Sequence, residues 1–499
     1  MDAEGEAVSF SRAFRSVTVA FFAYAAALSA HIGSPDVYLD ADAGPYRLFV
    51  TVRAPQVIPG VAQLEVRSGT PDVTSMHATP LGMMGATAKF VPNADALQRS
   101  KNDPQFFTGT LWLMKTGSWQ VRLFAQGARG SGEISIPFPA VARRTRTMQA
   151  GLGAALFALM SFLILGLVAI AGAALREAQL EPGVLPSVAQ RYKGRIVMGA
   201  TFLLLIAIVW LGNRWWKSDA NAYGQNVYKP LRMAATLENG NPLQLTISDP
   251  GWLQWRKIDD FVPDHNHLMH LYMIREPGMD AVYHLHPDMK SAGVFQLDLP
   301  SLRSGQYWLY ADVVHEDGFP ETLVATVRLP DIKGRPLAGD DAFGATKPVT
   351  EESGSSTSFA LPDGYRMLWD GGTQNLRAKQ PRLFRFRLLD PAGKAPGDMA
   401  FYMGMLGHAA FVKTDGSAFA HIHPNGSVAM AAFMMAEAQT SSSGDRMNMQ
   451  GMSMNDTRTT LPNEVAFPYG FPTAGRYRIF VQMKHGNRVK TGIFDANVQ

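Results

Sequence analysis

Residues 264–270 read Asp-His-Asn-His-Leu-Met-His, and residues 283–287 read Tyr-His-Leu-His-Pro. A second set follows in the same order: residues 402–408 read Tyr-Met-Gly-Met-Leu-Gly-His, and residues 421–424 read His-Ile-His-Pro. Side chains two residues apart in a strand point to the same face of a sheet, so each His-x-His pair can converge on one point. The second half of the chain is therefore organised around two histidine clusters.

The two clusters belong to an internal repeat, with one copy at residues 231–330 and the other at residues 358–498. The copies align at four histidine positions: His270 with His408, His284 with His421, His286 with His423, and His315 with His485. The segment before the repeat has the same Thr-Gly-Ser-Trp type of turn but lacks the His-x-His-Pro sequence. If the three segments share a fold, that fold does not need these histidines, which points to a function for them.

Composition favours a mainly β protein of several domains. The chain has 499 residues with 46 Gly and 31 Pro, and many short runs rich in Val, Tyr, Phe and Trp. Such runs between turn residues are typical of β-sandwich modules. We expect three immunoglobulin-like β-sandwich domains at residues 35–142, 221–330 and 358–499, with a mobile linker at residues 331–357. In the first domain, residues 109–114 and 119–125 read as a hairpin.

Three apolar stretches predict how the chain meets a membrane. Residues 1–31 read as a signal peptide or N-terminal anchor, because Arg12 and Arg15 precede a short apolar run. Residues 149–175 and 196–213 read as transmembrane helices joined by a cytoplasmic loop at residues 176–195. This topology puts all three β domains on one side. We expect a protein of the bacterial inner membrane whose main domains are periplasmic or otherwise extracytoplasmic.

Several functional classes find no support in the sequence. The net charge is only +4 without a dense basic run, so nucleic acid is not an expected partner. The chain has no cysteine, which excludes disulfides and thiolate metal sites. No Ser-His-Asp set, phosphate-binding loop or paired-carboxylate signature is recognisable, so we expect no enzyme. A copper or iron oxidoreductase stays open as an alternative.

Imidazole and thioether groups are ligands for copper and related metals, with thioether favouring Cu(I). Met403 and Met405 are expected to alternate on one strand face, and residues 446–455 hold four further methionines in a polar insertion. The competing interpretation is that the histidines pack or form hydrogen bonds and that the methionines fill gaps. The candidate metal ligands are His265, His267, His270, His284, His286, His315, His408, His421, His423, His485, Met403, Met405, Met447, Met449, Met452 and Met454.

The His-Asn-His-Leu-Met-His and His-Leu-His-Pro sequences, with their counterparts at residues 402–408 and 421–424, resemble bacterial periplasmic modules of the YtkA-like and FixH-like kind. The resemblance covers residues 231–499. It implies small immunoglobulin-like sandwiches associated with copper handling or cytochrome oxidase assembly. Carried over by position, it implies ligands at His270, His284, His286, His408, His421 and His423. The tandem arrangement and the membrane hairpin depart from a single soluble module.

These observations predict a membrane-anchored protein that binds copper, as Cu(I), Cu(II) or both. Its expected work is to buffer copper or to deliver it to a membrane system, with another membrane or periplasmic protein as partner. The alternative is a non-catalytic accessory or assembly subunit of a membrane complex, in which the sandwiches are docking modules and the histidines serve packing.

Overall fold

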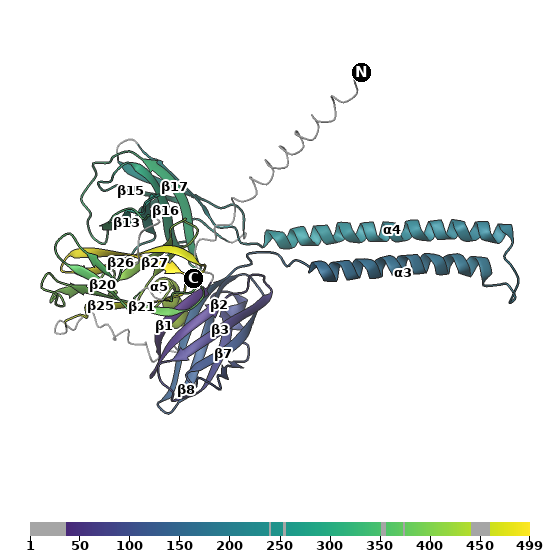
Figure 1. Ribbon diagram of the computed structural model, residues 1–499, viewed down its shortest axis with the longest axis horizontal. Coiled ribbons are helices and arrows are strands. Elements are labelled where there is room, and N and C mark those ends of the chain that lie inside the picture. Colours follow the sequence, from purple (N-terminus) through teal and green to yellow (C-terminus); the bar gives the residue numbers. More distant parts are fainter. Residues whose placement is uncertain (1–35, 239–240, 253–255, 351–355, 373–374, 441–459) are drawn as a thin grey trace, which may run out of the picture.

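The computed structural model describes residues 36–499, apart from residues 239–240, 253–255, 351–355, 373–374 and 441–459. In these residues the chain forms three antiparallel β-sandwich domains and two long helices that point away from them (Figure 1). The prediction of a mainly β chain with two long apolar helices is confirmed. The segment at residues 1–31, predicted to be a signal peptide or anchor, lies outside the described residues.

Domain 1 covers residues 36–142 and stacks two sheets around one core. The first sheet has the order β1 (Asp36–Ala43), β2 (Tyr46–Arg53), β3 (Gly60–Ser68), β7 (Phe106–Leu113) and β6 (Gln98–Arg99). The second has the order β5 (Asp95–Ala96), β4 (Val73–Gly82), β8 (Gly117–Gly127) and β9 (Gly130–Ala140), and the short helix α2 (Ala86–Lys89) follows β4. The hairpin predicted at residues 109–114 and 119–125 is wrong, because β7 and β8 belong to opposite sheets and the turn between them crosses the core.

Domain 2 covers residues 227–345 and repeats the two-sheet plan. One sheet has the order β10 (Arg232–Leu237), β11 (Pro242–Ser248), β15 (Val294–Asp298) and β14 (Asp288–Ser291). The other has the order β17 (Pro320–Leu329), β16 (Gly305–Val314), β12 (His270–Glu276), β13 (Ala281–Leu285) and β18 (Ala342–Ala345). Strand β18 lies within the segment predicted to be a mobile linker. That segment instead adds an edge strand to the sheet, where Ala342 pairs with His284.

Domain 3 covers residues 358–499. One sheet has the order β19 (Ser358–Ala360), β20 (Arg366–Asp370), β21 (Arg382–Leu389) and β25 (Glu464–Tyr469). The other has the order β22 (Met399–Ala400), β26 (Gly475–His485), β23 (His408–Lys413) and β24 (Phe419–Ile422), with β27 (Arg488–Val498) paired to β26. Helix α5 (Met430–Thr440) follows β24 and packs against domain 1.

Domains 2 and 3 pack against each other through the two sheets that carry the repeated histidines. Strand β12 is buried on both faces, because Leu271 and Met273 enter the core of domain 2 while Tyr272 and Ile274 face domain 3. The residues that pack between the domains are Tyr272, Ile274, Met279, Val282, Tyr310, Ala410, Val412, Phe419, Phe480 and Ile493. Burying each large apolar side chain stabilises such an interface by about 1.5–3 kcal/mol. The interface therefore holds the two domains in a fixed register.

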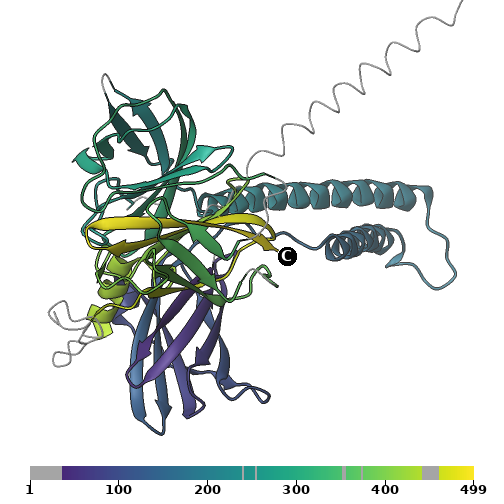
Figure 2. The same ribbon diagram turned by 60° about the vertical axis from the view of Figure 1, so that its left-hand side comes forward.

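Helices α3 (Ala150–Glu177) and α4 (Val188–Gln225) form an antiparallel pair that extends away from the domains in both views (Figures 1 and 2). Core helices of soluble proteins are mostly buried. In contrast, only 6% of the most apolar 18-residue stretch of α3 is buried, and none of the corresponding stretch of α4. Their length and exposed leucines are compatible with a membrane anchor. Helix α4 extends beyond the predicted span of residues 196–213 at both ends.

Both ends of this helical hairpin return to the same place in the fold. Ala142, eight residues before α3 begins, forms a parallel bridge with Val227, two residues after α4 ends. The hydroxyl group of Tyr223 donates a hydrogen bond to the carbonyl of Ile58, which ties the end of α4 to domain 1. Domain 1 therefore lies on the same side of the hairpin as domains 2 and 3.

This arrangement gives a topology prediction that exploits the absence of cysteine. We expect Lys101→Cys in domain 1 and Lys394→Cys in domain 3 to react equally with an impermeant maleimide added to spheroplasts. Leu185→Cys, at an 80% exposed position between the helices, should react only after the membrane is opened. Opposite labelling of the Lys101 and Lys394 positions would contradict the shared side.

Candidate metal centre

Eight histidines meet at one end of the interface between domains 2 and 3. They come from the starts of β12 and β23, the ends of β13 and β24, and the turn before β12. Ring centroids from the two domains lie 5.3 Å apart for His270 and His421 and 5.0 Å apart for His265 and His408. We call this set the histidine cluster: His265, His267, His270, His284, His286, His408, His421 and His423. The sequence placed the two sets of histidines in separate domains, whereas the fold brings them together in one cluster across the interface.

A tight turn before β12 aims one of these side chains across the interface. Asp264 and His267 exchange two backbone hydrogen bonds of 2.9 Å, and between them His265 and Asn266 have φ values of 50° and 69°. Non-glycine residues rarely adopt this left-handed conformation. As a result, His265 reaches the histidines of domain 3. The alignment of the two repeat copies did not predict that a histidine of domain 2 would contact histidines of domain 3.

The same turn occurs before β23, at Tyr402 and Met405, with Met403 at φ 51°. The prediction that Met403 and Met405 alternate on a strand is therefore wrong, because they belong to a turn. Both are buried, and Met403 packs with Ala342 and Tyr402. Met269 is buried in the core of domain 2. The candidates Met447, Met449, Met452 and Met454 lie outside the described residues.

The first triad consists of His270, His284 and His286, whose ligand atoms all lie within 4.8 Å of one another. His270 Nε2 lies 3.0 Å from the carbonyl oxygen of Asp264, which can only accept, so this nitrogen carries the proton. His286 Nδ1 faces a carboxylate oxygen of Asp341 at 3.1 Å. The other ring nitrogens, Nδ1 of His270 and Nε2 of His286, therefore present lone pairs to the interior.

His284 completes the first triad with the help of domain 3. Its Nδ1 lies 2.9 Å from Oε1 of Gln482 and 3.3 Å from the hydroxyl oxygen of Tyr402, which donates its own proton to the carbonyl of Asp340. His284 Nδ1 is therefore the donor, and its Nε2 has a free lone pair. This Nε2 lies 3.2 Å from the Nδ1 atom of His270, which also presents a lone pair. Two facing lone pairs at this distance repel unless a cation lies between them.

The second triad consists of His265, His408 and His423, whose ligand atoms also lie within 4.8 Å of one another. The Nε2 atoms of all three are buried, and none has a hydrogen-bond partner among the described residues. Buried polar atoms are rarely left without a partner. These three nitrogens are therefore the strongest sign in the structure that a bound group belongs here.

The outer nitrogens of the second triad are tied down. His423 Nδ1 donates to the carbonyl of Val428 at 3.1 Å, and the His265 ring hydrogen-bonds to the backbone of Met403. His408 Nδ1 lies 3.1 Å from His421 Nε2, and His421 Nδ1 lies 3.3 Å from a carboxylate oxygen of Asp312. Outer hydrogen bonds of this kind fix the tautomer and orientation of metal-binding histidines. His421 thus supports His408 and is not itself part of a triad.

Burial keeps the histidines of the two triads, and His421 beside them, neutral. Burial and then the neighbouring His423 lower the pKa of His265 to about 4, and burial followed by His267 lowers the pKa of His286 to about 3. Burial is also the main reason that the pKa values of the remaining triad histidines and of His421 are lowered. Neutral imidazole is the form that binds metal. An imidazole with the ordinary pKa of about 6.5 would lose metal to protons below that pH, and these lowered pKa values put proton competition at lower pH.

Domains 2 and 3 make equivalent contacts with each other, in which a residue at the same repeat position of each domain contacts a histidine of the other. Gln482 and Asp312 occupy equivalent places in the repeat, since Gln482 pairs with His408 and Asp312 pairs with His270 in the sheets. Gln482 contacts His284 of the other domain, and Asp312 contacts His421 of the other domain. Each domain therefore positions a histidine of its neighbour.

Three other candidates lie at or beyond the edge of the triads. His267 stacks on His286 with ring centroids 3.8 Å apart and faces Asp340. His315 is enclosed by carboxylates, with Asp260 at 2.7 Å and Glu321 at 3.2 Å, and these raise its pKa although burial lowers it. His485 stacks on Tyr365 and faces Asp398. His315 and His485, predicted as metal ligands from the repeat, are not part of either triad. Each instead faces carboxylates away from the triads.

Domain 1 holds the loop that follows the second His-x-His pair. Leu39 of edge strand β1 bridges to Gly426, and Ser427 exchanges hydrogen bonds with the backbone of Tyr38. Val428, whose carbonyl accepts the hydrogen bond from His423, is part of the core of domain 1. The position of His423 therefore depends on the histidine-poor domain.

Comparison with known proteins finds a match to one family model over part of the chain. A family described as a domain of unknown function (DUF8832) matches residues 226–330 and 358–499, which carry the whole histidine cluster. No match to YtkA-like or FixH-like modules accompanies it. No curated protein matches the chain.

Solved structures give only distant likenesses. They include a tetra-tandem repeat in the extending region of a large adhesion protein, with 8% identity, 89% of this chain and 72% of that chain covered, and a TM-score of 0.17. Alpha-2-macroglobulin of Escherichia coli has 9% identity, 91% and 31% coverage, and a TM-score of 0.18. The ICAM-5 D1–D4 ectodomain fragment has 9% identity, 91% and 77% coverage, and a TM-score of 0.14. These likenesses carry no functional conclusion.

The buried neutral histidines predict an acid-labile metal-free protein. Each has a lowered pKa in the folded state, so below about pH 6.5 the unfolded chain binds protons that the folded chain does not. Stability is then retained above pH 6.5 and lost as the pH falls, by up to about 1.4 kcal/mol per pH unit for each histidine. Urea unfolding of metal-free full-length protein in detergent should show this between pH 7.5 and 5.

A matched pair of variants tests the origin of this slope. His284→Gln should reduce it by about one proton, whereas His485→Ala, at a histidine outside the cluster, should leave it unchanged. A midpoint that is constant over this pH range would contradict the burial of neutral imidazoles.

Proposed function

We propose that this chain is a membrane-anchored copper-binding protein of the bacterial inner membrane, with its β domains in the periplasm. The observation that carries this proposal is the set of six inward-facing imidazole nitrogens in the two triads, with outer nitrogens tied to other groups. The exposed apolar helices α3 and α4 support the anchor. The protein would buffer copper or deliver it to a neighbouring membrane system.

The donor set supports a borderline transition metal. Each triad consists of imidazoles alone, and hard cations such as Mg²⁺ and Ca²⁺ prefer oxygen ligands. Among divalent first-row metals, copper binds nitrogen sites most strongly. Three protein ligands per triad leave positions through which an ion could be exchanged with a partner, as delivery requires.

The proposed role is binding without catalysis, with another membrane or periplasmic protein as partner. An oxidoreductase using copper or iron is the enzyme alternative, and redox turnover with a defined substrate would separate it from a carrier. In the accessory-subunit alternative, the histidines serve only to pack domains 2 and 3 together. Metal content separates that alternative from the proposal directly.

Copper titration of the full-length protein in detergent should give two ions per chain. The double variant His284→Ala/His286→Ala should bind one, and so should His265→Ala/His423→Ala, because each removes two ligands of one triad. His485→Ala, outside the cluster, should still bind two. Wild-type copper content below one ion per chain, together with a lower melting temperature in both double variants, would favour the packing role.

A single variant separates this geometry from a site within each domain. His421→Ala should keep the second ion and weaken its affinity about 10- to 100-fold, because His421 orients His408 and does not belong to a triad. Loss of the second ion in His421→Ala but not in His265→Ala would show that domain 3 binds its metal alone.

The methionines at positions 447, 449, 452 and 454 support a second, softer mode of capture. Thioether sulfur prefers Cu(I), and Leu keeps the size of Met without the ligand atom. The fourfold Met→Leu variant should therefore lose Cu(I) affinity in a competition titration and keep Cu(II) content. Equal Cu(I) affinity in variant and wild type would remove this segment from the proposal.

A further inference from the structure

The inward Nε2 atoms of His265, His286, His408 and His423 are buried, so an ion needs a route to reach them. His284 and His408 have no exposed surface and His423 is 3% exposed, whereas His265 and His286 are half-buried. Above the triads, the interface is filled by the side chains that pack between domains 2 and 3, such as Tyr272 and Phe419. Protein interiors are packed as densely as organic crystals, so an ion does not pass through them without a channel.

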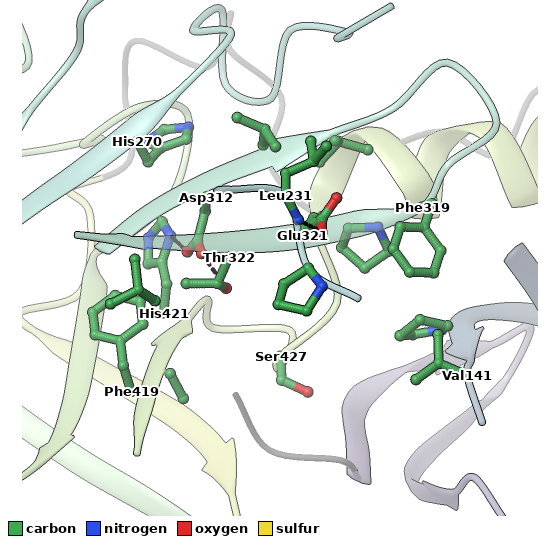
Figure 3. A pocket seen from close by; sticks show the side chains of 18 of the residues that line it. Val141, Leu231, His270, Asp312, Phe319, Glu321, Thr322, Phe419, His421 and Ser427 are labelled. Carbon is green, nitrogen blue, oxygen red and sulfur yellow. Dashed lines mark hydrogen bonds and ion pairs between the residues drawn. The ribbon is translucent and has the colours of Figure 1, made fainter. Parts of the chain in front are cut away.

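A large cavity reaches the cluster from the region where the three domains meet. Its volume is about 1110 Å³. At one end it is lined by His270, His421 and His423, and at the other by Val141, Arg143 and Tyr228. Figure 3 shows His270 and His421 on one side of this space and Val141 on the other. The cavity therefore extends from the histidine cluster to the segments that lead into the helices.

The far end of this central cavity lies beside the membrane anchor. Arg143 lies seven residues before α3 begins, and Tyr228 lies three residues after α4 ends. The backbone of Tyr228 donates a hydrogen bond to the carbonyl of Ala142, which holds the two segments together. The far end of the cavity thus lies against the base of the helical hairpin.

Carboxylate side chains line the cavity near the histidine cluster. Asp312 lies at the cluster end, where one oxygen faces His421 and the other accepts a hydrogen bond from the hydroxyl group of Thr322. Asp264 also lines the cavity and supplies the carbonyl that orients His270. Glu321 is occupied by Arg256 and His315 and is not available to an ion. At the inner end, Asp312 and Asp264 thus hold His421 and His270 in position, and burial raises the pKa of Asp312 to about 7.

We propose that this cavity is the route by which metal ions enter and leave the histidine cluster, with its mouth toward the membrane surface. The inference rests on the proposed metal binding and adds the direction of exchange. The metal donor or acceptor then has to approach along the membrane, beside the base of α3 and α4.

A label attached to an introduced cysteine on the cavity wall can narrow the cavity without changing a triad histidine. The chain has no cysteine of its own, so only the introduced thiol reacts. Val324→Cys and Ala429→Cys place a thiol on the cavity wall from domains 2 and 3, respectively. Each metal-free protein in detergent is labelled with a small methyl-transferring or a bulky benzyl-transferring methanethiosulfonate and then mixed with copper. We expect the bulky label to slow copper uptake at least tenfold, with two ions still bound at equilibrium. The small label should have little effect.

Lys101→Cys, labelled with the same bulky reagent on the exposed surface of domain 1, is the matched control and should take up copper at the wild-type rate. Equal uptake rates at full labelling of both cavity positions would overturn the route, and so would loss of a bound ion. If unlabelled wild-type protein binds no copper, the proposed function itself fails. That result is read before any labelling and is distinguishable from a failure of the route.

Discussion

The buried imidazoles must each present a lone pair inward while the opposite nitrogen is held by another group. This constraint explains why outer nitrogens of the cluster face acceptors, such as the backbone carbonyls of Asp264 and Val428 and the side-chain oxygen of Gln482. A carbonyl can only accept, so it fixes which nitrogen carries the proton. Burial then disfavours the charged form, and the pKa values fall. The rest of the fold supplies these acceptors at the right positions.

Some features of the histidine cluster are shared by both copies of the repeat, and others come from differences between the copies. Both copies use the same turn, the same pair of facing histidines and the same cross-domain partner position. The copies then diverge: His265 corresponds to Met403, and Asp312 corresponds to Gln482. The first difference gives the second triad a ligand from domain 2, so this site exists only while the two domains are docked. A metal held there would join the domains as well as occupy a site.

Much of this could be predicted from the sequence. Period-two patterns and turn residues indicated β sandwiches, and the repeat identified His270, His284 and His286 as a group. The sequence could not show how the domains dock, because an internal repeat aligns equivalent residues and carries no information on which faces meet. His265 was therefore a candidate without an assigned partner, and His421 was assigned as a ligand. Strand β18 was missed because its short Ala-Phe-Gly-Ala sequence has little strand character, and pairing with β13 decides its conformation.

Domain 1 has no part in the triads, yet the second triad depends on it. An edge strand has unpaired backbone groups that can bind another segment. Here β1 uses them to hold residues 425–427, directly after the second His-x-His pair. Arg122 and Gln120 of the same domain contact Gln439 at the end of α5, so the loop is held from both sides. Because domain 1 also binds the end of α4 through Tyr223, the helical hairpin and the loop that orients His423 are attached to one sandwich. A partner that displaced β1 from this loop would therefore act on His423 without touching a metal ligand.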